Sequence, residues 1–179
     1  EIEKELQRFN SPAEGLGQFI YDKGREYGID PVFAYAWFRK ETGLGGNSGA
    51  VTARNAKSMS NIIWHEGCYR KVYNSNLKKN FCGYESWEDG IDEWYRQMRL
   101  YIDRDKLDTV EEIVPKYAPS SENDVEEYIE DIRDFVEEYK EIPCVSKSLA
   151  KNADVGSVAS APSARQTSDK DSKDISQEE

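Results

Sequence analysis

The sequence predicts one mainly helical α+β domain, with a small irregular or β-hairpin wall that lines a groove. Three observations predict this class. Helix start and stop signals recur along the chain, and the segment from Pro31 to Glu41 is apolar on nearly all sides. Residues 44–85 have no helical period and hold short apolar clusters among Gly, Ser and Asn.

The first expected helix runs from Pro12 to Tyr27, because Ser11-Pro12-Ala13-Glu14 has the pattern of a capping box and Gly28 is a stop signal. Residues 44–85 contain short apolar clusters such as Ile62-Ile63-Trp64, which could form brief strands but no large sheet. An ordered segment of this length without a helical period is more often a functional wall than a connector.

Three further helices are expected after this wall. Ser86-Trp87-Glu88-Asp89 is a second N-terminal box, and apolar residues at helical spacing continue to Ile102. A short helix from Thr109 to about Lys116 precedes Tyr117-Ala118-Pro119. Apolar residues between Val125 and Tyr139 then recur with the period of a strongly amphipathic last helix.

We assign residues 1–143 to this domain and residues 144–179 to a disordered tail, or to a linker that leads to an additional module. The second segment is rich in Ser, Ala, Lys and Asp and has no aromatic residue, so it lacks the apolar content needed to pack. The chain starts at Glu1-Ile2-Glu3 without a methionine or a signal peptide, which indicates a processed or excised piece.

The charge of the chain argues against a nucleic-acid partner. The formal net charge is −11, and between Glu122 and Glu141 there are 10 acidic and 2 basic side chains. Phosphate binding needs clustered Lys and Arg, which this composition does not provide. A solvated helix face is the expected role of the acidic run. No apolar run reaches the 18 or more residues of a membrane span.

Three cysteines occur, and an odd number rules out complete internal pairing. Cys68 and Cys82 flank one loop region and could be bridged, which would indicate an oxidising compartment; three reduced thiols, Cys144 included, are the other interpretation. The single histidine, His65, lacks the second histidine of a zinc-binding helix. We therefore expect no metal site, no cofactor and no nucleophilic triad.

Glu41 is the candidate catalytic residue, at the end of the apolar helix and just before a glycine-rich stretch, residues 42–49. The negative end of the helix dipole lies near it, and Trp37 and Phe38 share its face and can desolvate it, so both effects should raise its pKa. A carboxylic acid that stays protonated near neutral pH is what general-acid cleavage of a glycosidic bond requires. The alternative is a solvated, inert glutamate, as most glutamates near helix ends are.

Three motifs follow one another in an order found in one superfamily. The segment from Ala34 to Gly45 looks like a helix that ends in a catalytic glutamate, and Tyr84 to Ile91 is similar to the start of a capped helix after a groove-lining hairpin. The segment from Thr109 to Ile129 looks like a Tyr-Ala-Pro element with a Glu-Asn-Asp helix start. Together they resemble the lysozyme-like superfamily of bacterial and phage cell-wall hydrolases, over about residues 13–142, and within it the glucosaminidase-type domains.

The resemblance implies a lysozyme-like fold and a bacteriolytic glycosidase, secreted to the cell wall or associated with a virion, that cleaves β-1,4 bonds in the glycan strands of peptidoglycan. Glu41 then takes the role of the catalytic acid, and Tyr117 matches a catalytic tyrosine near that acid. Family members often carry an Asn-Asn or Asn-Pro pair at the groove, where this chain has Lys57 to Ile62. Here Ser58 and Asn61 offer polar groups to a sugar acetamide. The substrate-binding residues expected from the resemblance are Ser58, Asn61, Trp64 and Glu66.

The sequence leaves three alternatives open. The reaction needs either a second carboxylate, for which Glu66 and Glu85 are candidates, or assistance from the substrate's N-acetyl group positioned by Tyr117, which we favour here. A lytic transglycosylase would use Glu41 as acid and then as base. A glycan-binding or virion structural module without turnover would keep the same fold around a solvated Glu41.

Overall fold

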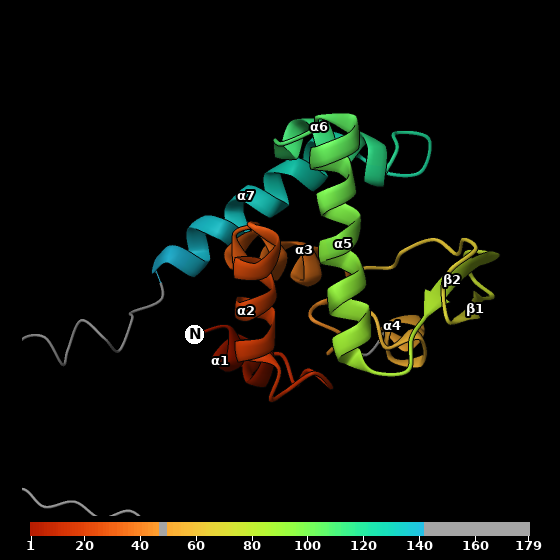
Figure 1. Cartoon of the computed structure of the whole chain (residues 1–179), viewed down its shortest axis with the longest axis horizontal. Helices are drawn as coiled ribbons and strands as arrows, with labels where there is room; N and C mark the ends of the chain where they lie inside the picture. Colours follow the sequence, from red (N-terminus) through yellow and green to blue (C-terminus); the bar gives the residue numbers. More distant parts are fainter. Residues whose placement is uncertain (47–49, 142–179) are drawn as a thin grey trace, which may run out of the picture. The chain divides into compact units, whose positions relative to one another are not determined.

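The computed structural model describes residues 1–46 and 50–141 (Figure 1). This part of the chain contains seven helices and one antiparallel β-hairpin, so the predicted mainly helical class with a small hairpin wall is confirmed. The predicted tail, residues 144–179, lies outside the described residues. No helix in the described ranges is both long and apolar enough to cross a membrane. In chain order the elements are α1 (Ile2–Arg8), α2 (Gly17–Tyr27), α3 (Pro31–Thr42), α4 (Val51–Ala56), β1 (Arg70–Asn74), β2 (Lys79–Gly83), α5 (Trp87–Asp105), α6 (Val110–Tyr117) and α7 (Val125–Glu141).

Helix α3 lies at the centre of the domain. It begins as the sequence predicts, because Asp30 Oδ1 accepts a hydrogen bond of 2.9 Å from the backbone nitrogen of Val32 and Pro31 occupies the first turn. It ends at Gly43, whose φ of 56° is the left-handed conformation that favours glycine at a helix end. All five residues from Ala34 to Phe38 have an exposed fraction of 0%. The middle of this helix is therefore buried, as apolar residues on nearly all of its sides predict.

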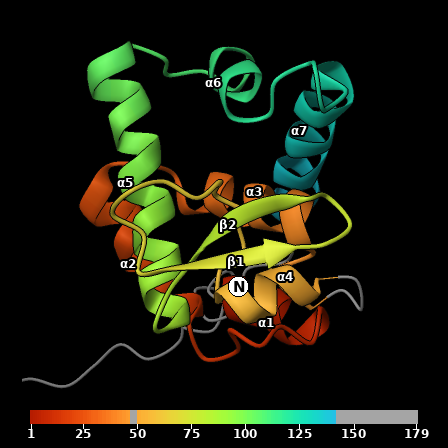
Figure 2. The same ribbon diagram turned by 90° about the vertical axis from the view of Figure 1, so that its right-hand side faces the viewer.

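Helices α2, α5 and α7 pack around α3, and the hairpin lies to one side of them. Figure 2 shows α5 and α7 as two upright helices connected through the short α6, with α3 behind the hairpin and between them. Helix α7 packs along α3, α2 packs on α3 and α5, and α4 packs on both strands. The carboxyl end of α3 therefore lies where the helical part of the domain meets the hairpin wall.

The wall is a two-stranded hairpin supported by one short helix. Val72 pairs with Phe81 in the antiparallel register, and Ile63 from the preceding loop forms an isolated bridge to the same Phe81. The expectation of brief strands is confirmed, whereas the expectation of no helix between residues 44 and 85 is wrong because of α4. At six residues, α4 is less than two turns long, too short to produce a recognisable helical period.

The start of the first long helix differs from the prediction. Ser11 does not cap a helix at Pro12; its hydroxyl accepts a hydrogen bond of 3.1 Å from the backbone nitrogen of Ala13 and donates one of 2.6 Å to the carbonyl of Leu44. Residues 12–15 form turns, and Gly15 has a φ of 94°, which a right-handed helix does not allow. Helix α2 consequently begins only at Gly17.

Helix α5 begins where the sequence predicts and packs closely on the loop before the wall. Ser86 and Asp89 form the expected capping box. In the first turns of this helix, a Cβ on Gly90 would lie 2.2 Å from the carbonyl oxygen of Lys57. Only glycine allows this approach, which fixes the loop leading to Asn61 against the domain.

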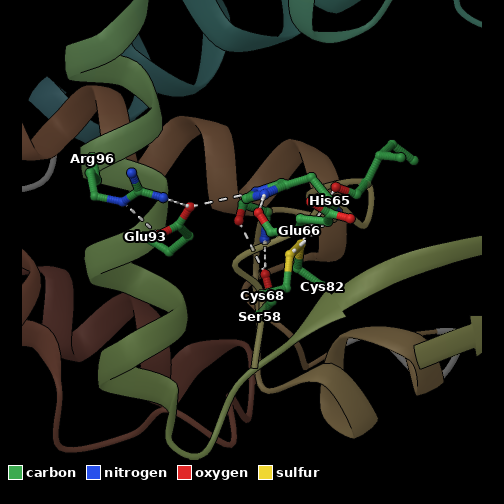
Figure 3. Close-up of a disulfide and its surroundings, with 9 residues drawn as sticks. Ser58, His65, Glu66, Cys68, Cys82, Glu93 and Arg96 are labelled. Carbon is green, nitrogen blue, oxygen red and sulfur yellow. Dashed lines mark hydrogen bonds and ion pairs between the residues drawn. A yellow bond between two sulfur atoms is a disulfide. The ribbon is translucent and has the colours of Figure 1, made fainter. Parts of the chain in front are cut away.

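A disulfide joins Cys68, in the loop before β1, to Cys82 on β2, with 5.3 Å between their Cα atoms (Figure 3). The predicted pairing is therefore present. The figure also shows His65 between this disulfide and Glu93 of α5, with 3.8 Å between His65 Nε2 and Glu93 Oε1. The disulfide thus fixes the loop of residues 65–68 to the hairpin beside α5.

Reduction of this disulfide is expected to lower the free energy of unfolding by about 3 kcal/mol, the loop-closure value for a separation near 15 residues. Urea unfolding with and without a dithiol reductant measures the effect. The double variant Cys68→Ala/Cys82→Ala is the control, because its stability should not respond to reductant. Titration of three thiols in the denatured, unreduced protein would show that the disulfide does not form.

Candidate active site

The carboxyl group of Glu41 is held by two donors from distant parts of the chain. Asn61 Nδ2 donates a hydrogen bond of 3.0 Å to Glu41 Oε2 and one of 3.2 Å to the backbone carbonyl of the same residue. The hydroxyl of Tyr128, on α7, donates to Glu41 Oε1. Both carboxyl oxygens therefore have a fixed position relative to α3, α7 and the loop before the wall.

Burial raises the pKa of Glu41 above its ordinary value of 4.5. The hydrogen bonds from Tyr128 and Asn61, and the ammonium of Lys40, favour the charged form and oppose this effect, in that order of size. The ammonium of Lys40 is itself paired with the carboxylate of Asp131 on α7. Desolvation is the largest effect, so Glu41 holds its proton to higher pH than a glutamate in water does.

Asn61 reaches Glu41 because two local features fix its loop. Its φ of 49° is left-handed, a conformation that asparagine adopts more readily than most residues. Thr42 is next to Glu41, and its hydroxyl donates a hydrogen bond of 3.0 Å to the carbonyl of Met59. The same hydroxyl accepts a hydrogen bond of 3.0 Å from the backbone nitrogen of Gly45. The end of α3 and the loop that carries Asn61 are thereby joined directly.

Two tyrosines pack on Trp37 behind the acid. The ring of Tyr117 contacts that of Trp37 edge-on, with 4.8 Å between the ring centroids. The centroid of the Tyr128 ring lies 5.5 Å from that of Trp37. Burial, and next the charge of Glu41, raise the pKa of both tyrosines well above 10.0. Both hydroxyls therefore remain protonated donors, Tyr128 toward Glu41 and Tyr117 toward the carbonyl of Ser60.

Three hollows meet at Glu41, which is a lining residue of all of them. One, of about 250 Å³, lies between β2 and the turn from α6 to α7 and is lined by Lys79, Phe81, Tyr117 and Glu122 among others. The second, of about 260 Å³, extends toward α4, and the third, of about 350 Å³, extends toward the start of α7. Glu41 therefore borders open space toward β2, toward α4 and toward the start of α7.

The structure brings only part of the predicted site to Glu41. Asn61 lines two hollows, and Tyr117 lines one, although its hydroxyl contacts Ser60 and not the acid. Ser58 is only 1% exposed, and its hydroxyl lies 3.1 Å from that of Ser60. Trp64 lies under the ammonium of Lys71, 3.6 Å from its ring centroid. The predicted residues that line none of the three hollows are Ser58, Trp64, Glu66 and Glu85.

Tyr128 is the contact that sequence reasoning missed. The sequence predicts Tyr128 only as one of the apolar residues of the last helix, and its ring is indeed buried, at 4% exposure. Its hydroxyl nevertheless reaches a carboxyl group 87 residues earlier in the chain. The only sequence signal is that Tyr128 falls at a core position of a helix that packs on α3, which does not distinguish a site tyrosine from a core tyrosine.

One group of possible metal ligands exists in the described part of the chain. Atoms of His65, Cys68 and Cys82 lie within 4.8 Å of one another. The two sulfur atoms are joined in the disulfide, and the thiolate is the form of cysteine that binds a metal. The oxidised group is therefore no metal centre.

Comparison with known proteins identifies no relative of this chain. The chain matches no protein-family model, no curated protein and no solved structure.

The raised pKa predicts a pH-dependent gain in stability for Glu41→Gln. A carboxyl whose folded-state pKa is raised contributes stability below its unfolded value of about 4.5, and this contribution is lost as pH rises through the folded pKa. Glutamine does not titrate. The melting temperature of the variant, relative to wild type, should therefore increase between pH 4 and pH 8. A constant difference over this range would show that Glu41 is not desolvated.

Proposed function

We propose that this protein is a glycoside hydrolase that cleaves β-1,4 bonds between amino sugars in peptidoglycan, with Glu41 as the general acid. The observation that carries the proposal is the position of Glu41, half-buried with a raised pKa and yet lining three hollows. A general acid needs both properties, because it must retain a proton near neutral pH and reach the leaving oxygen. A glycan-binding module without turnover has no need of such a group.

The motifs and the architecture support the substrate class. The three motifs that resemble glucosaminidase-type domains fall at the end of α3, at the start of α5 and around α6 to α7. A mainly helical domain with a small hairpin wall is the architecture that a lysozyme-like fold would have. The disulfide between Cys68 and Cys82 is typical of oxidising compartments and agrees with a secreted or cell-wall location.

In the proposed reaction, Glu41 protonates the glycosidic oxygen as its bond to the anomeric carbon breaks. Asn61 and Tyr128 hold the carboxyl in one orientation, which keeps the acidic proton directed at the leaving oxygen. Phe81 and the exposed side chains of Ile63 and Leu77 line the hollow beside the acid and offer apolar surface to sugar rings.

The proposal is tested by measuring new reducing ends released from purified peptidoglycan. We expect release at acidic to neutral pH and a decline as pH rises through the raised pKa of Glu41, because the acid then loses its proton. Binding to peptidoglycan without release of reducing or anhydro ends over this pH range would instead support the module without turnover.

A further inference from the structure

A second carboxylate, Glu122, shares two hollows with Glu41. It lines the hollow beside β2 and also the hollow at the start of α7. The turn between α6 and α7 holds it there, because its backbone nitrogen donates a hydrogen bond of 2.9 Å to the carbonyl of Pro119. The turn thus presents a carboxylate to the same space from which a sugar would contact Glu41.

Other acidic residues fit this position less well. Asp124 lines only the hollow at the start of α7, and its carboxylate caps α7 by accepting 3.1 Å from the nitrogen of Glu127. Glu127 lines the same single hollow. Glu66 and Glu85, the two candidates of the sequence, line none of the three. Among the described acidic residues, Glu122 is the one that lines two of these three hollows together with Glu41.

The two carboxyl groups have contrasting surroundings. Glu41 is half-buried and bonded to two uncharged donors, whereas the side chain of Glu122 is 48% exposed and forms an ion pair with Lys79 of β2. Two carboxyl groups that line the same hollows, one desolvated and one solvated and ion-paired, form an arrangement in which one group can give a proton and the other can take one. Lys79 reaches Glu122 from the hairpin, so the pair connects the two walls of the hollow.

We propose that Glu122 is the general base that activates water for attack on the glycosidic bond protonated by Glu41. This inference rests on the function proposed above. Glu122 takes one proton from a water molecule as the water oxygen bonds to the anomeric carbon. The bond from that carbon to the glycosidic oxygen breaks, its electron pair stays on this oxygen, and Glu41 supplies the proton. One water is consumed, and the β-linked sugar is released as the α anomer.

Assistance by the substrate's N-acetyl group is the competing mechanism. It forms a ring with the anomeric carbon before water attacks, so two inversions return the β anomer. In the sequence-based hypothesis Tyr117 positions the N-acetyl group, whereas in the structure its hydroxyl donates to the carbonyl of Ser60. The configuration of the first product therefore separates the two mechanisms without any substitution.

The test follows cleavage of a short soluble N-acetylglucosamine oligosaccharide by proton NMR, early enough to precede mutarotation. We expect the α anomer from the wild-type protein and a loss of about 10²-fold or more in kcat for Glu122→Gln. Glu126→Gln is the matched control, because this exposed residue near the start of α7 lines none of the three hollows. Equal melting temperatures of the three proteins establish that folding is unchanged.

Azide provides a readout that a structural role would not affect. In Glu122→Ala, azide needs no base and should attack in place of water, which restores turnover and gives an α-glycosyl azide detectable by mass spectrometry. A β anomer from wild type, or wild-type kcat in Glu122→Gln, would overturn the role of Glu122 and leave the proposed hydrolase intact. Absence of cleavage by wild type both of this oligosaccharide and of purified peptidoglycan would remove both proposals.

Discussion

Glu41→Gln is expected to lose nearly all glycan cleavage while the domain stays folded. General acid catalysis contributes about 10² to 10⁴ in rate, and the contribution is largest where the leaving group is poor, as a sugar alkoxide is. Glutamine keeps the size of the side chain and an oxygen that can accept from Asn61, but it has no acidic proton. The measurement is the decrease in turbidity of purified cell walls together with the far-ultraviolet circular dichroism of the variant.

Glu85→Gln is the control for Glu41→Gln, because Glu85 is exposed and lines none of the three hollows. It should clear cell walls at the wild-type rate. Clearing by Glu41→Gln at the same rate as this control would show that Glu41 is not the acid.

Tyr128→Phe is expected to lower turnover and to move the alkaline side of the pH profile to higher pH. The hydroxyl of Tyr128 favours the charged form of Glu41, so its removal raises the pKa of Glu41 further. The acid then keeps its proton to higher pH. At the pH optimum, a carboxyl that has lost one of its two fixed partners is less well oriented, which can cost up to about 10²-fold in kcat. The pH dependence of kcat on a soluble oligosaccharide measures both effects.

Tyr117→Phe is the comparison for Tyr128→Phe, because both hydroxyls are buried close to Trp37 but only that of Tyr128 bonds to Glu41. Removal of the Tyr117 hydroxyl leaves the carbonyl of Ser60 without this donor and should cost about 1 kcal/mol of stability. It should leave the alkaline side of the pH profile in place. A shift of equal size in both variants would show that the effect does not pass through the hydrogen bond to Glu41.

The sequence predicts best those elements whose signals are local. Helix α3 has an N-cap, a proline and a terminal glycine within 14 residues, and its burial follows from apolar residues on all of its faces. Helix α1 lacks such signals. Its Glu5 is only 5% exposed, and the carboxylate accepts hydrogen bonds of 2.6 Å from Arg8 and 2.8 Å from Tyr35. A buried charge whose partner lies 30 residues away breaks the amphipathic pattern that would reveal the helix.

In the candidate site, too, the residue with local sequence signals can be predicted, and the residues placed by long-range packing cannot. Glu41 can be predicted, since the helix end and the apolar run that precedes it are neighbours in the chain. Its partners Asn61 and Tyr128 cannot be assigned from sequence, because their contacts depend on a left-handed loop residue and on how α7 packs along α3. In the sequence Glu122 is only part of a helix-start motif, because its place in the hollows depends on the turn from α6 to α7.

Hydrolysis of the glycan strand directed by Glu41 can be followed by digestion of purified peptidoglycan in ¹⁸O-labelled water and mass analysis of the products. We expect normal reducing ends that carry one heavy oxygen per cut with the wild-type protein, and no new ends with Glu41→Gln. Products with unlabelled 1,6-anhydro ends, or intact glycan strands after treatment with wild type, would contradict this expectation.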